Sequence, residues 1–269
     1  MSTSFAEYSS TPGTNWSVLK HILTSPAHYR AAIVAEKRAP SAAMRVGSLA
    51  DALVFGTDAA QYVAGPYDDY RTKAAQEWRR EQEAAGRVVV SAGEYEAATR
   101  IAHAVGLDPH ARRILDGARY QVPLAWTDAK TGIACKGLAD IVGPGWLYDL
   151  KTARTIAPRA FLRQAGQLGY LGQLGFYAHG IEATTSDRPD DVGWIVVESA
   201  APYDVGVITL PPEIIAVAMT YARQALDTLA ECIAANRWPG IYGGEVHRMT
   251  LDELPYQLTD ALPEAFDLE

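Results

Sequence analysis

The chain has 269 residues, of which 48% are hydrophobic and 21% are charged, and its formal net charge is -8 at pH 7. This composition is typical of a globular protein and excludes a largely disordered chain. Its two cysteines, Cys135 and Cys232, are too few for a disulfide framework or a four-thiolate zinc or iron–sulfur site. The sequence has no apolar run of the roughly 18 residues that a membrane span needs, and its first ten residues do not resemble a signal peptide. We therefore expect a cytoplasmic protein without a membrane partner.

The first third of the chain is predicted to be helical. Ser25 followed by Pro26 is typical of a helix start, and Ser91 with Glu94 has the spacing of a capping box. Asp108 and Pro109 indicate a further start, and Gly117 is a suitable end. Helices are expected at about 25–37, 42–55, 91–105 and 109–117.

From Arg119 onward the apolar residues alternate with a period of two, which predicts a strand with one buried face. Turn residues follow at 127–132, and the GPG turn lies at 143–145. We therefore expect an antiparallel meander of three strands, at 119–126, 133–142 and 146–152.

The remaining elements alternate between helix and strand. A helical region is expected at about 158–179, strands at 192–198 and 203–210, and an amphipathic helix at 213–236. The predicted apolar face of the last helix contains Ile214, Val217, Tyr221, Ala225 and Leu229.

This order of elements predicts a mixed α/β fold, with a central antiparallel-to-mixed sheet flanked by helices. No linker is long enough to separate two domains, so we expect a single domain over 1–269. Its parts are a helical N-terminal layer (1–118), a core (119–242) and an acidic C-terminal tail (243–269).

Charged residues on the third strand of the meander are the strongest chemical signal. Asp149 and Lys151 are two residues apart and share one face, while Asp140 lies near the end of the neighbouring strand. Two carboxylates at one end of a sheet can hold a hard divalent cation, and an adjacent lysine can orient water. The alternative is a surface ion pair, with Asp140 merely ending its strand. The apolar neighbours of Asp149 favour the cation site, because a buried carboxylate needs a partner or a metal.

A third acid lies on the helix at 42–55. Helical periodicity places Asp51 beside Met44, Gly47, Val54 and Phe55, on the stripe expected to face the core. Asp51 is therefore a candidate metal ligand. A buried aspartate that caps or pairs with a neighbouring segment is the alternative.

Asp140, then Asp149-Leu150-Lys151, then Gln173 and Tyr177 form a pattern that resembles the PD-(D/E)XK nuclease superfamily. The chain is most similar to the exonuclease VIII (RecE-like) branch, a relative of lambda exonuclease, from about Ser17 to Tyr242. The matching pieces include GSLAD, CKGLAD, LYDLKTA and YLGQLGFY.

The resemblance implies a restriction-endonuclease-like core and a role for each matching residue. Asp140, Asp149 and the Leu150 carbonyl would bind the metal, Lys151 would be the catalytic lysine, and Gln173 and Tyr177 would line the site and contact DNA. Without the motif formed by Asp140 and Asp149-Leu150-Lys151, the alternative for the last two residues would be structural: Tyr177 packed on the sheet and Gln173 at the edge of the sheet.

Two positions depart from the family pattern. Many relatives have histidine at the position of Asp51, and many have glutamate at the position of Gln121. Aspartate is an oxygen donor that suits Mg²⁺ or Mn²⁺.

The resemblance further implies a Mg²⁺-dependent exonuclease, with Mn²⁺ as a substitute, that hydrolyses linear double-stranded DNA from its ends. The expected polarity is 5′-to-3′, in phage-type recombination with a single-strand annealing protein. A homo-oligomeric ring of three or four subunits is expected, in the host cytoplasm if the protein is phage-encoded. Two alternatives remain: a nuclease of another polarity or a structure-specific endonuclease, and a non-catalytic DNA-binding or assembly protein with a retained nuclease fold.

Two weaker signals accompany this pattern. Basic residues recur at Lys151, Arg154, Arg159 and Arg163 although the protein is acidic, and such a local patch can contact phosphates. Glycines recur every three residues at 166, 169, 172 and 175. They indicate close helix-to-sheet packing, or alternatively a backbone approach to DNA phosphates.

Overall fold

The computed structural model describes residues 8, 10–35, 39–67 and 70–253. Most of the predicted C-terminal tail, residues 254–269, lies outside the described residues, as does the predicted end of the first helix at 36–37. None of the helices in the described part of the chain has the length and apolarity to cross a membrane.

A five-stranded sheet forms the centre of the molecule, in the order β3-β4-β5-β6-β7. Its strands are β3 (Arg119–Thr127), β4 (Ala134–Gly143), β5 (Trp146–Ala153), β6 (Asp191–Glu198) and β7 (Val205–Leu210). The predicted antiparallel meander is confirmed, because β3 pairs with β4 and β4 with β5 in antiparallel register. The β5–β6 pair is parallel and the β6–β7 pair is antiparallel. The sheet is therefore mixed and mostly antiparallel, as expected.

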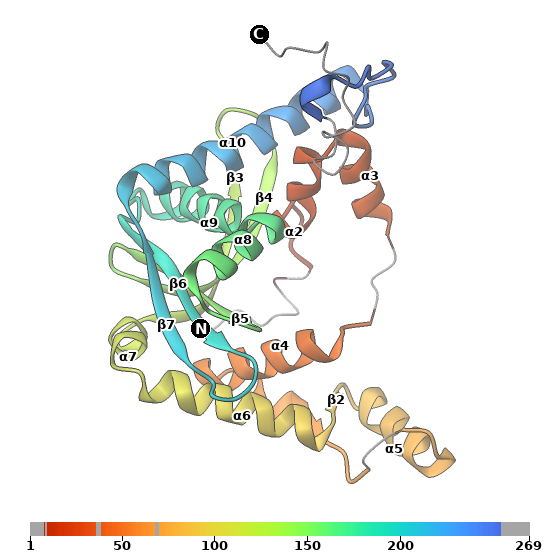
Figure 1. Cartoon of the computed structure of the whole chain (residues 1–269), viewed down its shortest axis with the longest axis vertical. Coiled ribbons are helices and arrows are strands. Elements are labelled where there is room, and N and C mark those ends of the chain that lie inside the picture. Colours follow the sequence, from red (N-terminus) through yellow and green to blue (C-terminus); the bar gives the residue numbers. More distant parts are fainter. Residues whose placement is uncertain (1–7, 9, 36–38, 68–69, 254–269) are drawn as a thin grey trace, which may run out of the picture.

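Helices cover both faces of this sheet, as Figure 1 shows. One face packs against α2 (Trp16–Leu19), α3 (Pro26–Val34), α8 (Pro158–Leu168), α9 (Tyr170–Thr185) and α10 (Pro212–Ala235), with the short η1 (Lys20–Leu23). The other face packs against α4 (Ala42–Phe55), α6 (Ala92–Leu107) and α7 (Pro109–Leu115). Each layer has its own buried apolar cluster, so the sheet is covered on both sides.

Local signals in the sequence set several of these boundaries. The Ser91 hydroxyl accepts the Glu94 N–H, and the Glu94 carboxylate accepts the Ser91 N–H, which confirms the capping box of α6. The helical region predicted at 158–179 is two helices, because Gly169 has a φ of 76° and ends α8. Glycine is the residue that adopts this left-handed conformation at little cost.

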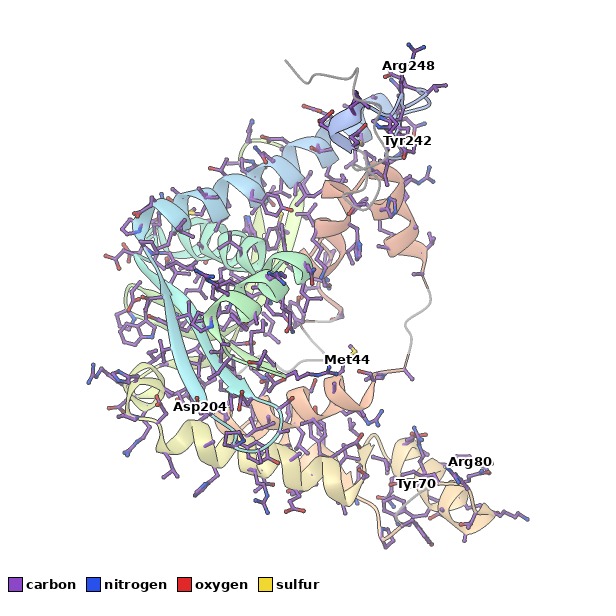
Figure 2. All side chains as sticks on the ribbon, viewed as in Figure 1. Met44, Tyr70, Arg80, Asp204, Tyr242 and Arg248 are labelled. Atoms are coloured by element: carbon purple, nitrogen blue, oxygen red, sulfur yellow. The ribbon has the colours of Figure 1, made fainter. Side chains whose placement is uncertain are left out.

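The segment between α4 and α6 contains elements that the sequence did not predict. Two three-residue strands, β1 (Tyr62–Ala64) and β2 (Val88–Val90), form a small parallel sheet beside α5 (Lys73–Ala84). Figure 1 shows α5 projecting beyond α6, and Figure 2 shows Tyr70 and Arg80 on this projection. Strands this short leave too little periodicity to read.

The buried face of α10 differs from the predicted one. Ala225 and Leu229 are buried as expected, but Ile214, Val217 and Tyr221 are 36%, 54% and 41% exposed. The helix instead buries a neighbouring stripe with small residues, which includes Ala218, Ala222 and Leu226. The reason is close packing against α9, where a Cβ on Gly175 would lie 2.1 Å from the Ala218 carbonyl oxygen.

The glycine repeat also packs differently from the expectation. A Cβ on Gly172 would overlap the Trp16 ring, and a Cβ on Gly175 would overlap the backbone of α10. These two glycines therefore allow close packing of one helix on another, and not of a helix on the sheet. At Gly166, by contrast, no described atom outside the local helix backbone lies within 4 Å of the Cβ position. The four glycines therefore differ: Gly169 ends a helix, Gly172 and Gly175 allow close helix packing, and Gly166 is an exposed helical residue.

Candidate functional site

The predicted site residues gather where β4 and β5 separate. The ladder between the two strands contains the pairs Gly143↔Trp146, Val142↔Leu147 and Ile141↔Tyr148. Asp140 and Asp149 are the next residues on their strands, beyond the last pair. From here β4 continues alongside β3, and β5 continues alongside β6. We call this opening, formed by Asp140, Asp149, Leu150 and Lys151, the fork.

At the fork, the Asp140 side chain replaces the backbone hydrogen bonding between β4 and β5. Asp140 Oδ2 accepts a hydrogen bond from the Leu150 N–H at 3.2 Å, where a strand partner would otherwise lie. The hairpin thus brings Asp140 against the Asp149-Leu150-Lys151 segment, as the sequence predicted. The short GPG turn keeps the two strands in register up to this point.

The Asp149 carboxylate is deeply buried and incompletely satisfied. Asp149 is 1% exposed, and its Oδ2 forms an ion pair with Lys151 Nζ, whose side chain is 15% exposed. Among the described residues, neither Asp149 oxygen has a hydrogen-bond donor of acceptable geometry. Burying an ionised carboxylate in this state is costly unless a cation compensates it.

Electrostatic coupling at the fork disturbs the protonation of its groups. Burial, followed by repulsion from Asp149, raises the pKa of the Asp140 carboxyl well above its ordinary value, against the opposing effect of Lys151. Burial lowers the pKa of Lys151, but the negative charges of Asp149 and Asp140 outweigh it, so the pKa is raised overall. Lys151 therefore stays protonated near neutral pH.

Asp51 belongs to the same electrostatic neighbourhood. Burial raises its pKa to about 7, with Lys151 opposing this rise and Asp149 adding to it. Its helix α4 passes near the end of β5, where a Cβ on Gly47 would lie 3.3 Å from Thr152 Oγ1. Met44, predicted on the core-facing stripe, is 61% exposed, and Figure 2 shows it on the side of α4 away from α6.

Gln173 and Tyr177 lie one turn apart on α9, beside the fork. Gln173 Nε2 donates a hydrogen bond to Tyr177 Oη at 3.2 Å, and Tyr177 is 8% exposed. The Tyr177 ring packs on β4 at Gly137, where a Cβ would lie 2.8 Å from the ring. Burial raises the pKa of the Tyr177 hydroxyl, and Asp140 and Asp149 raise it further against the opposing effects of Gln173 and Lys151. This hydroxyl is therefore a neutral hydrogen-bonding group.

Three residues that the sequence analysis did not assign to the site complete its surroundings. The Tyr170 ring centroid lies 4.7 Å from Lys151 Nζ. Burial lowers the pKa of Lys20, and the positive charge of Lys151 lowers it further. Trp16 Nε1 donates a hydrogen bond to the Gly169 carbonyl oxygen at 2.7 Å, next to Tyr170. The sequence contained only a weak signal for them, since Tyr170 begins the YLGQLGFY segment.

Gln121, the second departure from the family pattern, has another partner. Its Oε1 accepts a hydrogen bond from Thr57 Oγ1 at 2.9 Å, and its φ is 46°. This hydrogen bond joins β3 to the turn that follows α4.

The donor set at the fork fits a hard divalent cation in its chemistry. Among the described residues, neither buried oxygen of Asp149 has a hydrogen-bond partner, although Oδ2 forms the ion pair with Lys151. The raised pKa of Asp140 comes from burial and then from repulsion by Asp149, and a cation would relieve that repulsion. Among the described residues, no group of three histidine, cysteine, aspartate or glutamate side chains is close enough to hold a metal alone. A cation there would need backbone or water oxygens in addition to the two carboxylates.

The chain beside the fork is basic although the protein is acidic. No aspartate or glutamate occurs between Lys151 and Glu182. Arg159 and Arg163 are exposed on α8 at i and i+4, without an ion pair to a described residue. This surface therefore suits a polyanion.

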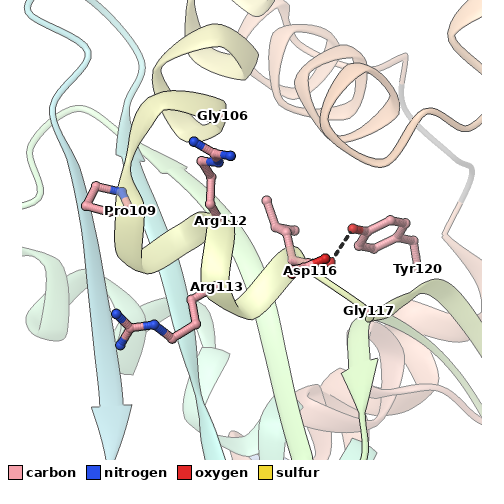
Figure 3. Close-up of a pocket in the computed structure, with 8 residues that line it drawn as sticks. Gly106, Pro109, Arg112, Arg113, Asp116, Gly117 and Tyr120 are labelled. Atoms are coloured by element: carbon pink, nitrogen blue, oxygen red, sulfur yellow. Dashed lines mark hydrogen bonds between the residues drawn. The ribbon is translucent and has the colours of Figure 1, made fainter.

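Other cavities lie apart from the fork. One of about 760 Å³ is formed by α7 and the start of β3, with Arg112, Arg113 and Tyr120 in its wall (Figure 3). Tyr120 Oη donates a hydrogen bond to the Leu115 carbonyl oxygen at 2.6 Å there. The wall contains none of the predicted site residues.

Comparisons with solved structures identify a similar fold. A candidate exonuclease from Eubacterium rectale superposes with a TM-score of 0.61, at 14% identity over 93% of this chain and 96% of that one. A phage-related exonuclease from Haemophilus somnus has a TM-score of 0.35, at 13% identity over 84% and 97% of the two chains. An alkaline exonuclease from Laribacter hongkongensis has a TM-score of 0.28, at 17% identity over 71% and 94%. The first likeness shows a shared fold, and the other two are too distant to support an argument.

The comparison with protein families is more specific. No curated protein matches the chain. The model of the PDDEXK-like domain of unknown function (DUF3799) matches residues 15–249, which include the whole sheet and every predicted site residue. The predicted superfamily is confirmed, and the chain belongs to this family of PDDEXK-like domains.

Proposed function

We propose that the protein is a divalent-metal-dependent deoxyribonuclease that hydrolyses phosphodiester bonds at the fork. The observation that carries the proposal is the buried Asp149 carboxylate, which lies beyond the last β4–β5 pair beside Asp140, with Lys151 as its ion-pair partner. The PDDEXK-like family supports the same reading.

Asp140, Asp149 and the Leu150 carbonyl would hold Mg²⁺, or Mn²⁺ in its place. Asp51 would contribute through a metal-bound water, since it forms no three-acid group with Asp140 and Asp149 among the described residues. When bound, the cation supplies charge neutralisation at the phosphate and activation of water. The Leu150 N–H fixes Asp140 through its hydrogen bond, so the backbone of β5 orients both carboxylates.

Lys151 acts as a hydrogen-bond donor and a fixed positive charge. Because its pKa is raised, it is not a general base near neutral pH. It can orient the attacking water and stabilise negative charge that develops on the phosphate. Gln173 and Tyr177 form a hydrogen-bonded pair on α9 that lines the fork and offers neutral polar contacts to DNA.

The proposed substrate is linear double-stranded DNA, degraded from its ends. The exposed Arg159 and Arg163 and the acid-free segment around them favour a phosphate backbone. The 5′-to-3′ polarity, a role in phage-type recombination, an annealing protein as partner and a ring of three or four subunits rest on the resemblance to RecE-like exonucleases.

End-labelled substrates test this function. Wild type and Lys151→Ala are incubated with 5′-phosphorylated linear duplex or covalently closed circular DNA, in Mg²⁺, Mn²⁺ or EDTA. We expect the wild type to release nucleotides from linear DNA with either metal and to leave circular DNA intact, while Lys151→Ala is inactive.

The other outcomes distinguish the alternatives. Cleavage of circular DNA would indicate an endonuclease, and release from the 3′ label first would reverse the polarity. Intact DNA under every condition, with binding retained, would indicate a non-catalytic DNA-binding protein.

A further inference from the structure

Lys151 lies between a carboxylate and an aromatic ring. Its Nζ pairs with Asp149 on one side and lies 4.7 Å from the centroid of the Tyr170 ring on another. Because lysine carries its ammonium on a flexible four-carbon stem, one ion pair does not fix where that group points. The Tyr170 ring is a second contact that restricts it, since the face of an aromatic ring attracts a cation at this distance.

Tyr170 is itself held by a bend in the chain, which we call the elbow, at residues 168–170. The elbow joins α8 to α9, and Tyr170 is the first residue of α9. Two side chains from the N-terminal helices bind its carbonyl oxygens: Trp16 Nε1 donates to Gly169 at 2.7 Å, and Lys20 Nζ donates to Leu168 at 2.9 Å. The N-terminal segment therefore ties down the elbow.

Packing reinforces these bonds. Gly172, the third residue of α9, lets the Trp16 ring approach so closely that a Cβ there would lie 2.1 Å from it. The Phe161 ring of α8 lies 6.5 Å from the Tyr170 ring, centroid to centroid. The Phe161 ring of α8 thus contacts the Tyr170 ring directly, while Trp16 of α2 holds the backbone on either side of Tyr170.

We propose that Tyr170 is a positioning residue, which holds the Lys151 ammonium in the fork through the face of its ring. This inference rests on the proposed function. Tyr170 acts through Lys151, and the Trp16 and Lys20 bonds to the elbow determine where its ring lies. The ring face rather than the hydroxyl makes the contact, so phenylalanine should replace tyrosine and leucine should not.

Two substitutions and a matched control separate positioning from folding. Tyr170→Phe keeps the ring, Tyr170→Leu keeps apolar bulk without the ring, and Tyr95→Leu makes the same change at an exposed position of α6. On linear duplex with Mg²⁺ we expect Tyr170→Leu to lower kcat about tenfold with little change in KM, because a misplaced lysine weakens the transition state rather than DNA binding. Tyr170→Phe should restore most of the lost kcat. A loss in Tyr170→Phe equal to that in Tyr170→Leu would overturn the proposal.

A second readout does not depend on activity. The urea midpoint of unfolding is measured for Tyr170→Leu with Lys151 present and in a Lys151→Met background, which forms a double-mutant cycle. We expect the Tyr170→Leu shift to be smaller once Lys151 is absent, and an equal shift in both backgrounds would contradict the contact. If the wild type cleaves no DNA, the proposed function and the positioning role both fail, while the cycle still decides whether the two side chains interact.

Discussion

Replacing Gly175 with alanine should destabilise the protein, because α9 and α10 approach each other at this glycine. The new Cβ would lie 2.1 Å from the Ala218 carbonyl oxygen and 2.3 Å from its carbon. These are backbone atoms, so no rotamer change relieves the overlap, and the two helices must move apart by more than about 1 Å in a close-packed interior.

The size of the effect follows from two opposing contributions. Overpacking a core costs about 1–3 kcal/mol, and more where backbone must move. Alanine recovers up to about 1 kcal/mol of helix propensity relative to glycine. Because the overlap here involves backbone, we expect a net loss of about 2 kcal/mol or more.

Gly166 is the matched control from the same glycine repeat. It also lies in a helix, but beyond the local helix backbone its Cβ position has no neighbour within 4 Å in the part of the chain that the structure describes. Gly166→Ala should therefore stabilise the protein, by about 0.5 kcal/mol.

Equilibrium unfolding in urea, followed by circular dichroism, measures both variants. The reasoning predicts shifts of opposite sign. A Gly175→Ala variant as stable as wild type, or two shifts of the same sign, would refute the close approach of α9 and α10.

Two further predictions concern charge. Burial alone would raise the pKa of Asp128, but Arg223 and Thr131 lower it to about 2, below the ordinary 3.8. Because the folded pKa is depressed, this stabilisation is fully present above the ordinary value and is lost as the pH falls towards 2. Asp128→Asn should thus cost about 1–2 kcal/mol at neutral pH and almost nothing near pH 2, as measured by guanidinium unfolding, and a cost independent of pH would contradict the pairing. On duplex DNA, replacing both Arg159 and Arg163 with alanine should weaken binding and reduce the slope of log affinity against log salt by about 2. Arg100→Ala on α6 is the control, and a slope unchanged in the double variant would exclude α8 from the interface.

The fork could be predicted because its determinants are local. Alternation of apolar residues defined the strands, and the GPG turn fixed their register, so Asp140 had to fall opposite Asp149. The sequence also placed Asp149 and Lys151 on one face, and their ion pair shows this arrangement. Short-range geometry was sufficient here.

Contacts between distant segments were beyond the reach of sequence periodicity. The predicted buried face of α10 was wrong. The close approach of α9 and α10 at Gly175, and not the size of the side chains on α10, determines which face is buried. Met44 lies on the predicted stripe yet is 61% exposed, because periodicity gives the face of a helix but not how far along the helix its neighbours extend. The elbow was missed because its partners, Trp16 and Lys20, are about 150 residues away in the chain.

Calorimetric titration with Mn²⁺ in the absence of DNA tests the central claim most directly. Wild type is compared with Asp149→Asn, which keeps the shape of the buried side chain, and with Asp187→Asn, which alters an exposed loop residue. Circular dichroism and the urea midpoint show whether each variant is folded. We predict that wild type and Asp187→Asn bind Mn²⁺ with similar affinity and that folded Asp149→Asn binds at least tenfold more weakly, because the fork then lacks one of its two carboxylates. Equal Mn²⁺ affinity in all three proteins would contradict a metal site at the fork.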